Sequence, residues 1–429
     1  MPPLRPCFAK FCRALRFPAV LLLTFFLLGT APAYRPTPAT ETAQAINAFT
    51  FDFLRQVPPE LFEKNTVLSP QSIFHNYAMS FVGSAGKTRE ELAQAFHFPP
   101  DENLLLTQLT AIRAQVKNDP TAQSTLLNAV WIGGRTEFKQ DYKNRLTGNF
   151  GAALFDDTFG NPQRSSDVIN RWIHDHTAGR VNDVVSSDDL QSERPTPNVV
   201  LHPALVLVNV AYFKSEWAAR FSSEATTPQP FHLSPAESQP VPMMAQIHHF
   251  DYAEDTDFQY VELPYKEGTF SLGVLLPRKN ISIPSLLKKI DADRLATLRE
   301  NAFTHEVDLL LPKFEMRTTL ELPEPLKALG IASAFDQEKA DFSPMFNRTY
   351  EAANLFIRHS RQQAWIKTDE EGTEAAAATT TTHFSIGCSS MDMQPPPAIF
   401  HADHPFAVFL LHRPSQTILF TGWYVSPER

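Results

Sequence analysis

The chain has 429 residues, of which 43% are hydrophobic and 20% are charged, so it is long enough to bury a large core. Its formal net charge at pH 7 is −9. Nucleic acid and anionic membranes repel an acidic chain, and we expect neither of them as a partner.

The N-terminus has the pattern of a secretory signal peptide over residues 1–33. Four basic residues precede an apolar core at Val20–Leu28, and Ala31–Ala33 forms a small-x-small cleavage site. The apolar core is short for a membrane span, which favours export over an uncleaved anchor. We therefore expect a secreted protein, extracellular or, in a bacterium, periplasmic, with no membrane contact after cleavage.

Export has two further consequences. Cleavage lowers the formal charge to −13 and leaves Cys388 as the one cysteine of the mature sequence, so no internal disulfide is expected. Asn280 and Asn347 each begin an Asn-x-Ser/Thr sequon. They are predicted glycosylation sites if the secretory pathway is eukaryotic.

Helices are predicted in the first part of the mature chain. Residues 34–45 are predicted to be a flexible start. Apolar side chains recur at helical spacing over 46–54, and the prolines at 58–59 predict the end of that helix. Ser69 followed by Pro70 predicts the N-cap and the first position of a second helix.

A capping box at Thr88 and Glu91 and a periodic segment at Val168–His176 predict two more helices.

The later part of the chain is richer in strands. The predicted strands are the apolar runs Ala204–Phe213, Phe270–Leu276, Val307–Leu311, Ala407–Leu411 and Thr417–Val425. Because strands and helices do not alternate regularly, the pattern predicts an α+β fold. No repeat or linker divides the sequence, so we expect one domain over 46–429.

The sequence carries no strong motif of an enzyme or a cofactor site. The histidines at His174–His176 and His401–His404 lack accompanying ligands at zinc spacing. Gly83–Thr88 looks like a phosphate-binding loop, but Phe81 occupies the place of its first glycine. Neither a Gly-x-Ser-x-Gly elbow nor a His-Glu-x-x-His motif occurs. We expect no metal, no cofactor and no enzymatic activity of the chain's own.

The segment Glu370–Ala378, which four threonines at Thr379–Thr382 follow, has two explanations. Its low complexity is typical of a flexible linker. Its small and β-branched side chains also suit a strand that slides between two existing strands, because they cause little steric conflict there. Composition alone favours the linker, and the rest of the chain favours the strand.

Six segments occur together in the order that is typical of the serpin family. They are Leu68–Ile73 with Gly83–Leu92, Asn209–Trp217, Leu311–Phe314, Asp341–Ser343, Glu370–Thr379 and Phe400–Phe406. The chain therefore resembles the serpins over nearly the whole mature length. The resemblance implies a single α+β domain with three β-sheets, a bundle of helices and an exposed reactive loop at about residues 370–398.

The resemblance also implies how the loop works. A serine protease cuts the loop as a substrate and becomes acyl-linked to it, and the loop then inserts into the main sheet as a new strand. The predicted hinge comprises Glu370, Glu371, Gly372, Thr373, Glu374, Ala375, Ala376, Ala377 and Ala378. Every second side chain from Thr373 to Thr379 would face the core, and all of these are small. This favours an inhibitor over the alternative, a non-inhibitory serpin that acts as a carrier or chaperone.

By resemblance, a further set of residues controls the opening of the main sheet. The set is Ser69, Ser72, Asn209, Trp217, Lys313 and Gln362. The first three match a polar cluster over which the strands part, Trp217 lies where the loop first enters, and Lys313 forms a salt bridge with Glu370. Gln362 stands where many members have a histidine. Glutamine cannot titrate, so a pH-sensitive opening is not expected.

The loop predicts the class of the target protease. From Gly372 to His412 there is no lysine or arginine, which argues against trypsin-like targets because their specificity pocket is acidic. Counting from the hinge at the usual family spacing puts the scissile bond at Ile386–Gly387. The loop is longer than usual, and three alternatives remain: Phe384, Cys388 and Met391. We expect a monomeric inhibitor whose covalent partner is a protease of the elastase, chymotrypsin or subtilisin kind.

Overall fold

The computed structural model of the chain describes residues 39–117, 122–133, 136–177, 179–196, 199–201, 205–279, 281–349, 355–373 and 396–427. All of these residues belong to one compact unit, Pro36–Arg429. The predicted signal peptide lies outside the described residues, as do Asn280 and the loop residues 374–395. Within the described ranges, no helix is both long and apolar enough to cross a membrane.

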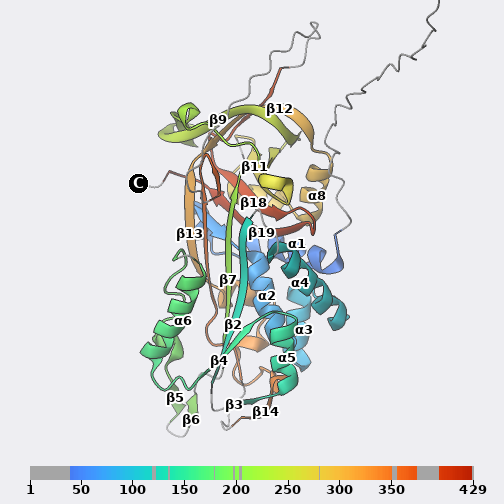
Figure 1. The fold of residues 1–429 in the computed structure, drawn as a ribbon, viewed down its shortest axis with the longest axis vertical. Coiled ribbons are helices and arrows are strands. Elements are labelled where there is room, and N and C mark those ends of the chain that lie inside the picture. The colour runs from blue at the N-terminus through green and yellow to red at the C-terminus, as the bar shows by residue number, and fades with distance from the viewer. Residues whose placement is uncertain are drawn as a thin grey trace, which may run out of the picture. The chain divides into compact units, whose positions relative to one another are not determined.

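The helices gather around two layers of sheet (Figure 1). They are α1 (Glu41–Leu54), α2 (Pro70–Phe81), α3 (Gly86–Ala95), α4 (Glu102–Lys117), α5 (Gln140–Gly148), α6 (Pro162–His176), α7 (Ile283–Lys289), α8 (Ala292–Glu300) and α9 (Pro323–Ala328). The helices predicted from Ser69 and Pro70 and over Val168–His176 are confirmed as α2 and α6.

α1 confirms the helix that was predicted over 46–54, and it begins earlier. The apolar residues on which that prediction rests are all buried, namely Ile46, Phe49, Phe53 and Leu54. The helix starts at Glu41, where the Thr40 hydroxyl accepts a hydrogen bond from the Ala43 amide at 3.2 Å. The prediction of a flexible segment up to residue 45 is therefore wrong for residues 41–45.

The capping box predicted at Thr88 and Glu91 is also wrong. α3 begins at Gly86, so Thr88 lies inside the first turn of the helix. The Thr88 hydroxyl accepts a hydrogen bond from the Asp341 amide at 3.0 Å, and the Glu91 carboxylate accepts one from the Ser333 amide at 2.6 Å. Both side chains thus serve a segment about 240 residues away, because a tertiary partner competes with the local cap.

The six-stranded sheet, called the main sheet below, carries the predicted hinge. Its strand order is β13 (Phe314–Glu321), β15 (Arg361–Thr368), β16 (Gly372–Thr373), β7 (Leu205–Glu216), β2 (Ala122–Gly133) and β4 (Ala153–Asp157). The buried strand predicted from residue 204 is confirmed as β7.

The second layer is a longer path of strands. Its order is β1 (Thr66–Leu68), β19 (Thr417–Tyr424), β18 (Phe406–His412), β11 (Phe270–Pro277), β10 (Phe258–Pro264), β9 (Glu237–Glu254), β12 (Phe303–Pro312) and β17 (Ala398–His401), and β8 (Thr227–Ser234) pairs with β9. β9 joins two sheets, because its last residues pair with β10 and its earlier residues pair with β12 and β8. Small two-stranded sheets are formed by β3 (Thr136–Phe138) with β14 (Phe346–Thr349) and by β5 (Glu193–Thr196) with β6 (Val199–Leu201).

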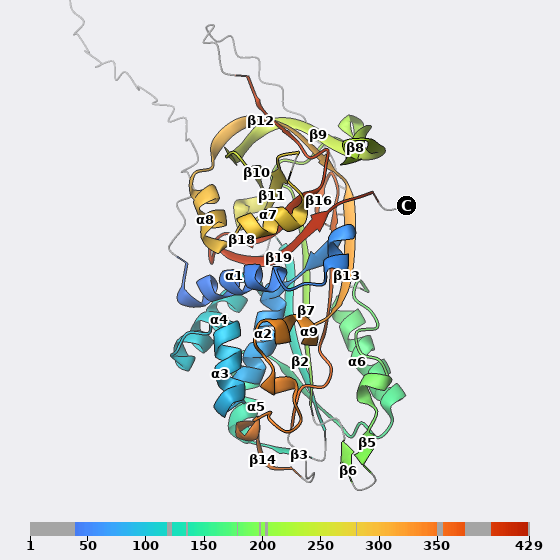
Figure 2. The ribbon, with the colours of Figure 1, turned by 180° about the vertical axis from the view of Figure 1, so that it is seen from behind.

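The two faces of β7 pack against different layers. Val206 and Val208 belong to the smaller apolar cluster that α6 covers. Ala211 and Phe213 belong to the large core, which also contains the apolar residues of α2. Figures 1 and 2 show α6 and α2 on different sides of the main sheet. Since strand side chains alternate, the odd-numbered residues of β7 face the large core.

A buried carboxylate ties the second layer to α8. Glu262 on β10 is fully enclosed and accepts hydrogen bonds from the Tyr260 and Ser271 hydroxyls at 2.8 and 2.7 Å. The Arg299 Nε donates to Glu262 Oε2 at 3.0 Å, and the Arg413 Nε lies 3.2 Å from Oε1. Burial alone would raise the pKa of Glu262, but the charges of both arginines and these hydrogen bonds lower it to about 2.

We predict that Glu262→Gln lowers the free energy of unfolding by ~3–5 kcal/mol at pH 7, because two arginines lose a buried counter-charge. The folded pKa of about 2 lies below the ordinary value of 4.5. The stabilisation is therefore complete above pH 4.5 and is lost as the pH falls toward 2. Urea unfolding from pH 7 to pH 3 should show the gap between wild type and variant narrowing below pH 4.5.

The exposed Glu324, which pairs with Lys327 at the surface, gives the matched control. Glu324→Gln should change the free energy of unfolding by less than ~1 kcal/mol. A gap for Glu262→Gln that stays constant with pH would contradict the assignment of a charged, arginine-paired carboxylate.

Candidate functional site

The predicted hinge begins as a strand of the main sheet. Thr373 pairs with Thr368 of β15 on one side and with Ser215 of β7 on the other. In the described ranges no strand pairing joins β15 directly to β7. The rest of the predicted hinge, Glu374 to Ala378, lies outside the described residues.

Gly372 brings the chain into very close contact with β7. Its backbone φ of +155° is one that residues with a side chain rarely adopt. A Cβ atom added there would lie 2.1 Å from the Ser215 carbonyl oxygen. That neighbour is backbone and has no rotamer with which to move away. Glycine is therefore the residue that allows β16 to enter beside β7.

The Thr373 side chain is fully buried on the core side of the sheet. Its hydroxyl lies 2.6 Å from the Tyr265 hydroxyl. Burial raises the pKa of Tyr265, so this hydroxyl stays protonated and able to hydrogen-bond. The Tyr265 ring stacks on Trp217 with centroids 4.4 Å apart. Sequence reasoning missed Tyr265, since it belongs to no motif and lies 108 residues from its partner.

Trp217 holds the chain that leads into β16. Its amide donates to the Glu371 carbonyl at 2.9 Å, and its indole Nε1 donates to the Asp369 carbonyl at 2.8 Å. Trp217 and Tyr265 also form an isolated β-bridge. The ring and the backbone of Trp217 thus fix both ends of the turn between β15 and β16.

Glu370 is anchored to the start of β13. Its Oε2 lies 2.8 Å from Lys313 Nζ, and its Oε1 accepts a hydrogen bond from the Thr226 hydroxyl at 2.8 Å. Burial would raise the pKa of Glu370, but the hydrogen bonds from Lys313 and Thr226 and the Lys313 charge lower it overall. Because the side chain is mostly covered, this pair restrains the turn before the hinge more firmly than an exposed ion pair does.

A second polar contact lies lower in the sheet. Gln362 on β15 is buried. Its side-chain oxygen accepts a hydrogen bond from the Ser69 backbone amide at 3.1 Å, and its side-chain nitrogen donates one to the Ser69 carbonyl at 2.7 Å. Ser69 occupies the N-cap position of α2, as predicted, but its hydroxyl donates to the Leu419 carbonyl at 2.8 Å and does not cap the helix. Ser72 is buried in the first turn of α2, and Asn209 pairs with Asn128 across β7 and β2.

The segment after α6 is hydrogen-bonded to β15. The Asn182 amide donates to the Gln363 side chain at 3.1 Å, and Arg361 donates to the Val184 carbonyl at 3.1 Å. β15 is therefore held from the α6 side through Arg361 and Gln363, and from the core side through Gln362. Any movement of β15 relative to β7 has to act against both sets of contacts.

The residues predicted for the scissile bond lie outside the described residues, namely Phe384, Ile386, Gly387, Cys388 and Met391. Of the two sequons, Asn347 is exposed and donates a hydrogen bond to Glu137 at 3.2 Å. Across the described residues, no group of three or more His, Cys, Asp and Glu side chains is arranged to hold a metal ion.

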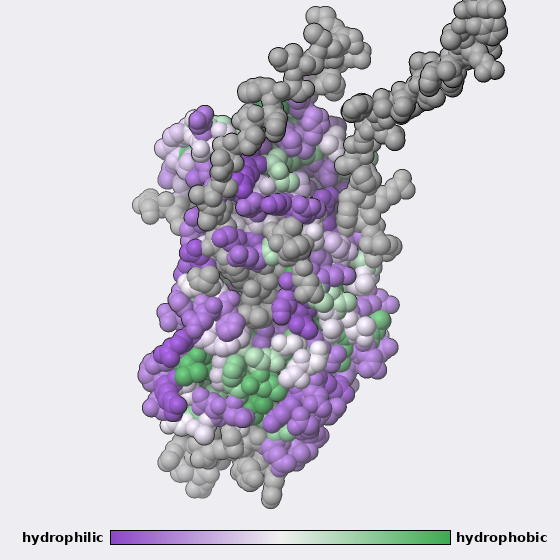
Figure 3. Space-filling view, in the orientation of Figure 1, coloured by the Kyte–Doolittle hydropathy of each residue, from purple (hydrophilic) through white to green (hydrophobic). Residues whose placement is uncertain are grey.

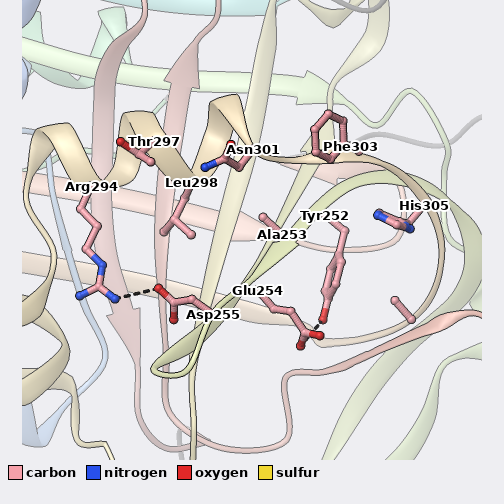
Figure 4. A pocket seen from close by; sticks show the side chains of 11 residues that line it. Tyr252, Ala253, Glu254, Asp255, Arg294, Thr297, Leu298, Asn301, Phe303 and His305 are labelled. Carbon is pink, nitrogen blue, oxygen red and sulfur yellow. Dashed lines mark hydrogen bonds and ion pairs between the residues drawn. The ribbon is translucent and has the colours of Figure 1, made fainter.

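An open pocket of about 510 Å³ lies between α8, the end of β9 and the start of β12 (Figure 4). Its carboxylates already serve the fold. Glu254 accepts hydrogen bonds from Tyr252 and Arg278, and Asp255 accepts one from Arg294 at 2.7 Å. Because these carboxylates are already paired within the protein, they are less available to bind a charged ligand. The hinge is therefore the more informative candidate site.

Comparison with known proteins places the chain in a family. The family model described as serpin (serine protease inhibitor) matches residues 44–427. An uncharacterised serpin-like protein of Thermococcus kodakarensis is 31% identical over 389 residues, which cover 90% of this chain and 85% of the relative. The leukocyte elastase inhibitor of Xenopus laevis is 30% identical over 398 residues, with 90% and 99% covered.

The solved structure of a cleaved Serpin 42Da aligns with a TM-score of 0.77 at 25% identity and covers 91% of this chain and 99% of that one. With a family model that matches residues 44–427, the chain belongs to the serpin family and has the serpin fold.

Proposed function

We propose that the protein is a secreted suicide-substrate inhibitor of serine proteases and not an enzyme. The target's serine attacks a carbonyl in the loop, the amine leaves, and an ester links the protease to the N-terminal part of the loop. The loop then inserts into the main sheet before water hydrolyses the ester. The observation that carries this proposal is the pairing of Gly372 and Thr373 between β15 and β7.

The pairing register supports insertion of the following residues. Six residues beyond Thr373 is Thr379, and six residues back along the two neighbours are Asn209 on β7 and Gln362 on β15. An inserted Thr379 would thus stand between the two polar residues that the resemblance assigns to the opening of the sheet. Thr373 faces the core, so every second residue after it would do the same.

The lengths of the neighbouring strands match the low-complexity segment. Continued in the same register, β15 offers pairing partners as far as residue 380 and β7 as far as residue 383. The small-residue segment ends at Thr382, at about the same level. Successive inserted residues would form backbone hydrogen bonds alternately to β15 and to β7, so the strand is bonded on both sides, which is a strong driving force for insertion.

The composition of the loop supports a target with an apolar specificity pocket. Ile386–Gly387 remains the bond that the hinge count favours, with the alternatives within 384–393. The similarity to a leukocyte elastase inhibitor of Xenopus laevis supports the same class of target. Secretion rests on the signal-peptide pattern of residues 1–33, and the mature inhibitor is proposed to be monomeric.

We predict that the mature chain forms an SDS-resistant complex with an elastase, chymotrypsin or subtilisin, and none with trypsin. Mass spectrometry of the released C-terminal peptide locates the cleaved bond. Cleavage outside 384–393, or complete turnover of the loop without a complex, would refute this specificity.

A second experiment, heat denaturation of nicked and intact protein, separates an inhibitor from a carrier or chaperone of the same family. An inhibitor whose cut loop inserts gains backbone pairs, so its thermal midpoint should rise by tens of degrees on nicking. A heat-denaturation scan of nicked and intact protein measures this rise. An unchanged midpoint would favour the non-inhibitory alternative.

A charge on the inward face of the inserted strand should turn the inhibitor into a substrate. Ala377→Glu would place a carboxylate in the core, where burial of an unpaired charge costs several kcal/mol. Insertion then slows and the ester is hydrolysed. The number of inhibitor molecules consumed per protease should rise by about tenfold or more. Ala378→Glu, one residue on and on the opposite face of the sheet, beside the half-buried and polar Gln363, is the control and should raise this number much less. Equal effects of both variants would contradict the register.

Loss of the Tyr265 hydroxyl should loosen β16. Tyr265→Phe leaves the buried Thr373 hydroxyl without its partner, at a cost of ~1–3 kcal/mol. Amide hydrogen exchange at Gly372 and Thr373 should accelerate by roughly 5- to 150-fold. Tyr142→Phe removes another buried hydroxyl, one that donates to the Met79 carbonyl, and should leave exchange at the hinge unchanged. Acceleration in both variants would point to general destabilisation instead.

A further inference from the structure

An exposed aromatic side chain stands at the pocket of about 510 Å³ beside α8, which we call the α8 pocket. Hydrophilic side chains predominate on the face shown in Figure 3. Among the large apolar side chains of the described residues, Phe303 at the start of β12 is the most exposed, at 67%. One exposed apolar side chain needs no explanation by itself. Phe303 differs because it lines a cavity.

The α8 pocket forms where the inner face of β12 extends past the end of the core. Val307, Leu309 and Leu311 point inward and are fully buried. Side chains alternate along a strand, so Phe303 and His305 project from the same face. Both are exposed and line the pocket opposite α8 (Figure 4). The volume lies within the ~300–1,000 Å³ that is typical of sites for small organic ligands.

Three rings form one wall of the α8 pocket. Phe303 pairs directly with Tyr252 of β9, so their rings project side by side. The centroids of the Tyr252 and His305 rings lie 5.9 Å apart, with their planes at 84°. Leu298 of α8 lies across the pocket from these rings (Figure 4). A wall of rings favours a flat aromatic ligand, which can stack on them or meet their edges.

The walls of the pocket are held in place by the protein itself. The Tyr252 hydroxyl donates to Glu254 at 2.9 Å and accepts a hydrogen bond from the Gln259 side chain at 2.8 Å. On α8, the Arg294 side chain donates to Asp255 at 2.7 Å. A pocket that is already ordered loses little conformational entropy when a ligand binds.

The charged groups at the pocket are neutralised within the protein. Glu254 is paired with Arg278 at 2.8 Å, and Asp255 is paired with Arg294 at 2.7 Å. A ligand with a net charge would find its counter-charge already engaged, and it would have to compete with these pairs. The electrostatics of the pocket therefore favour an uncharged ligand.

Two polar side chains of α8 are available to such a ligand. The Asn301 amide and the Thr297 hydroxyl line the pocket, and neither side chain forms a hydrogen bond within the described residues. Asn301 offers a donor and an acceptor, and Thr297 offers a hydroxyl. An aromatic molecule with a hydroxyl or carbonyl substituent can bond to them while its rings cover the aromatic wall.

One face of α8 serves the pocket and the other serves the fold. The four residues of α8 and its C-cap that line the pocket recur at helical spacing, namely Arg294, Thr297, Leu298 and Asn301. On the other face, Leu295 belongs to the large core and Arg299 donates to the buried Glu262. A ligand can therefore occupy the pocket without displacing the contacts that hold α8 on the second layer.

We propose that the α8 pocket binds a small uncharged aromatic molecule, of one ring or two fused rings, that carries a hydroxyl or carbonyl group. The rings rest against Phe303 and Tyr252, and the polar group bonds to Asn301. The concave shape favours a small molecule over a protein surface. This binding site does not depend on cleavage or insertion of the loop, so it goes beyond the proposed inhibitory function.

The test uses the intact mature protein and prodan, an uncharged naphthalene ketone whose fluorescence shifts to the blue in an apolar site. Prodan should bind saturably. Phe303→Ser should weaken its binding by about tenfold, because a stacking partner is lost. Asn301→Ala should weaken it by roughly two- to tenfold through loss of a hydrogen bond. Both positions are exposed, and thermal midpoints check that the variants are folded.

Ile247→Ser is the matched control. It removes a similarly exposed apolar side chain, 62% exposed, from a position of β9 that does not line the pocket. The dissociation constant of prodan should stay unchanged in this variant. Hydrogen exchange with saturating prodan gives a second readout, since the amides of Asn301 and Phe303 should be protected while those of the hinge at Gly372 and Thr373 are not.

Competition against prodan tests the charge of the ligand. Naphthol and naphthalene sulfonate share one ring system and differ in charge at pH 7. Naphthol should displace prodan, and the sulfonate should bind more weakly by about tenfold or more, because no unpaired cation receives it. Tighter binding of the sulfonate would overturn the uncharged class of ligand.

The remaining outcomes each decide the proposal. Absence of saturable binding of prodan and naphthol would refute the α8 pocket as a ligand site. Binding that survives both Phe303→Ser and Asn301→Ala, or that falls equally in Ile247→Ser, would place the probe elsewhere and refute it as well. None of these results affects the covalent complex with a protease, so failure of this proposal and failure of the proposed function are distinguishable.

Discussion

The function proposed for this chain depends on the backbone hydrogen-bonding edges that β15 and β7 present to each other. Buried backbone donors and acceptors need partners, and a strand between two edges satisfies both at once. β16 does so at Thr373, which is paired with Thr368 on one side and with Ser215 on the other, while Gly372 pairs with Glu216 of β7. The close approach is possible because residue 372 has no Cβ atom. Everything proposed for the loop is an extension of this one arrangement along the same two edges.

Contacts at two levels hold β15 and the turn before β16 in place. At the upper level Trp217 and Lys313 hold the turn before β16, and Tyr265 holds Thr373 inside the sheet. At the lower level Gln362 joins β15 to the start of α2 through both atoms of its amide. The side chains that make these contacts do not include a histidine. The expectation that opening of the sheet is insensitive to pH, which rests on glutamine at 362, stays a prediction.

Local sequence patterns predicted the elements well where one face of a helix or strand dominates, as in α1 and β7. They failed where a distant partner decides. Thr88 and Glu91 have the spacing of a capping box, yet both bind the segment around 333–341. The sequence of residues 41–45 suggested a flexible segment, yet these residues form the start of α1, which Thr40 caps.

Tyr265 was not predictable from the sequence, because its role depends on Thr373 and on the ring of Trp217, and no sequence spacing links the three. The resemblance to serpins supplied the hinge, and the structure supplied the atoms that hold it.

In the proposed mechanism, the cut separates two parts of the chain that belong to different sheets. The ester would tie the protease to the N-terminal part of the loop, which would follow β16 into the main sheet in the register that Thr373 sets. β17 lies on the C-terminal side of the predicted bond and pairs in parallel with β12, so it would stay in the second layer. Insertion would therefore move the two ends created by the cut apart, and the ester would no longer lie beside the amine that left it.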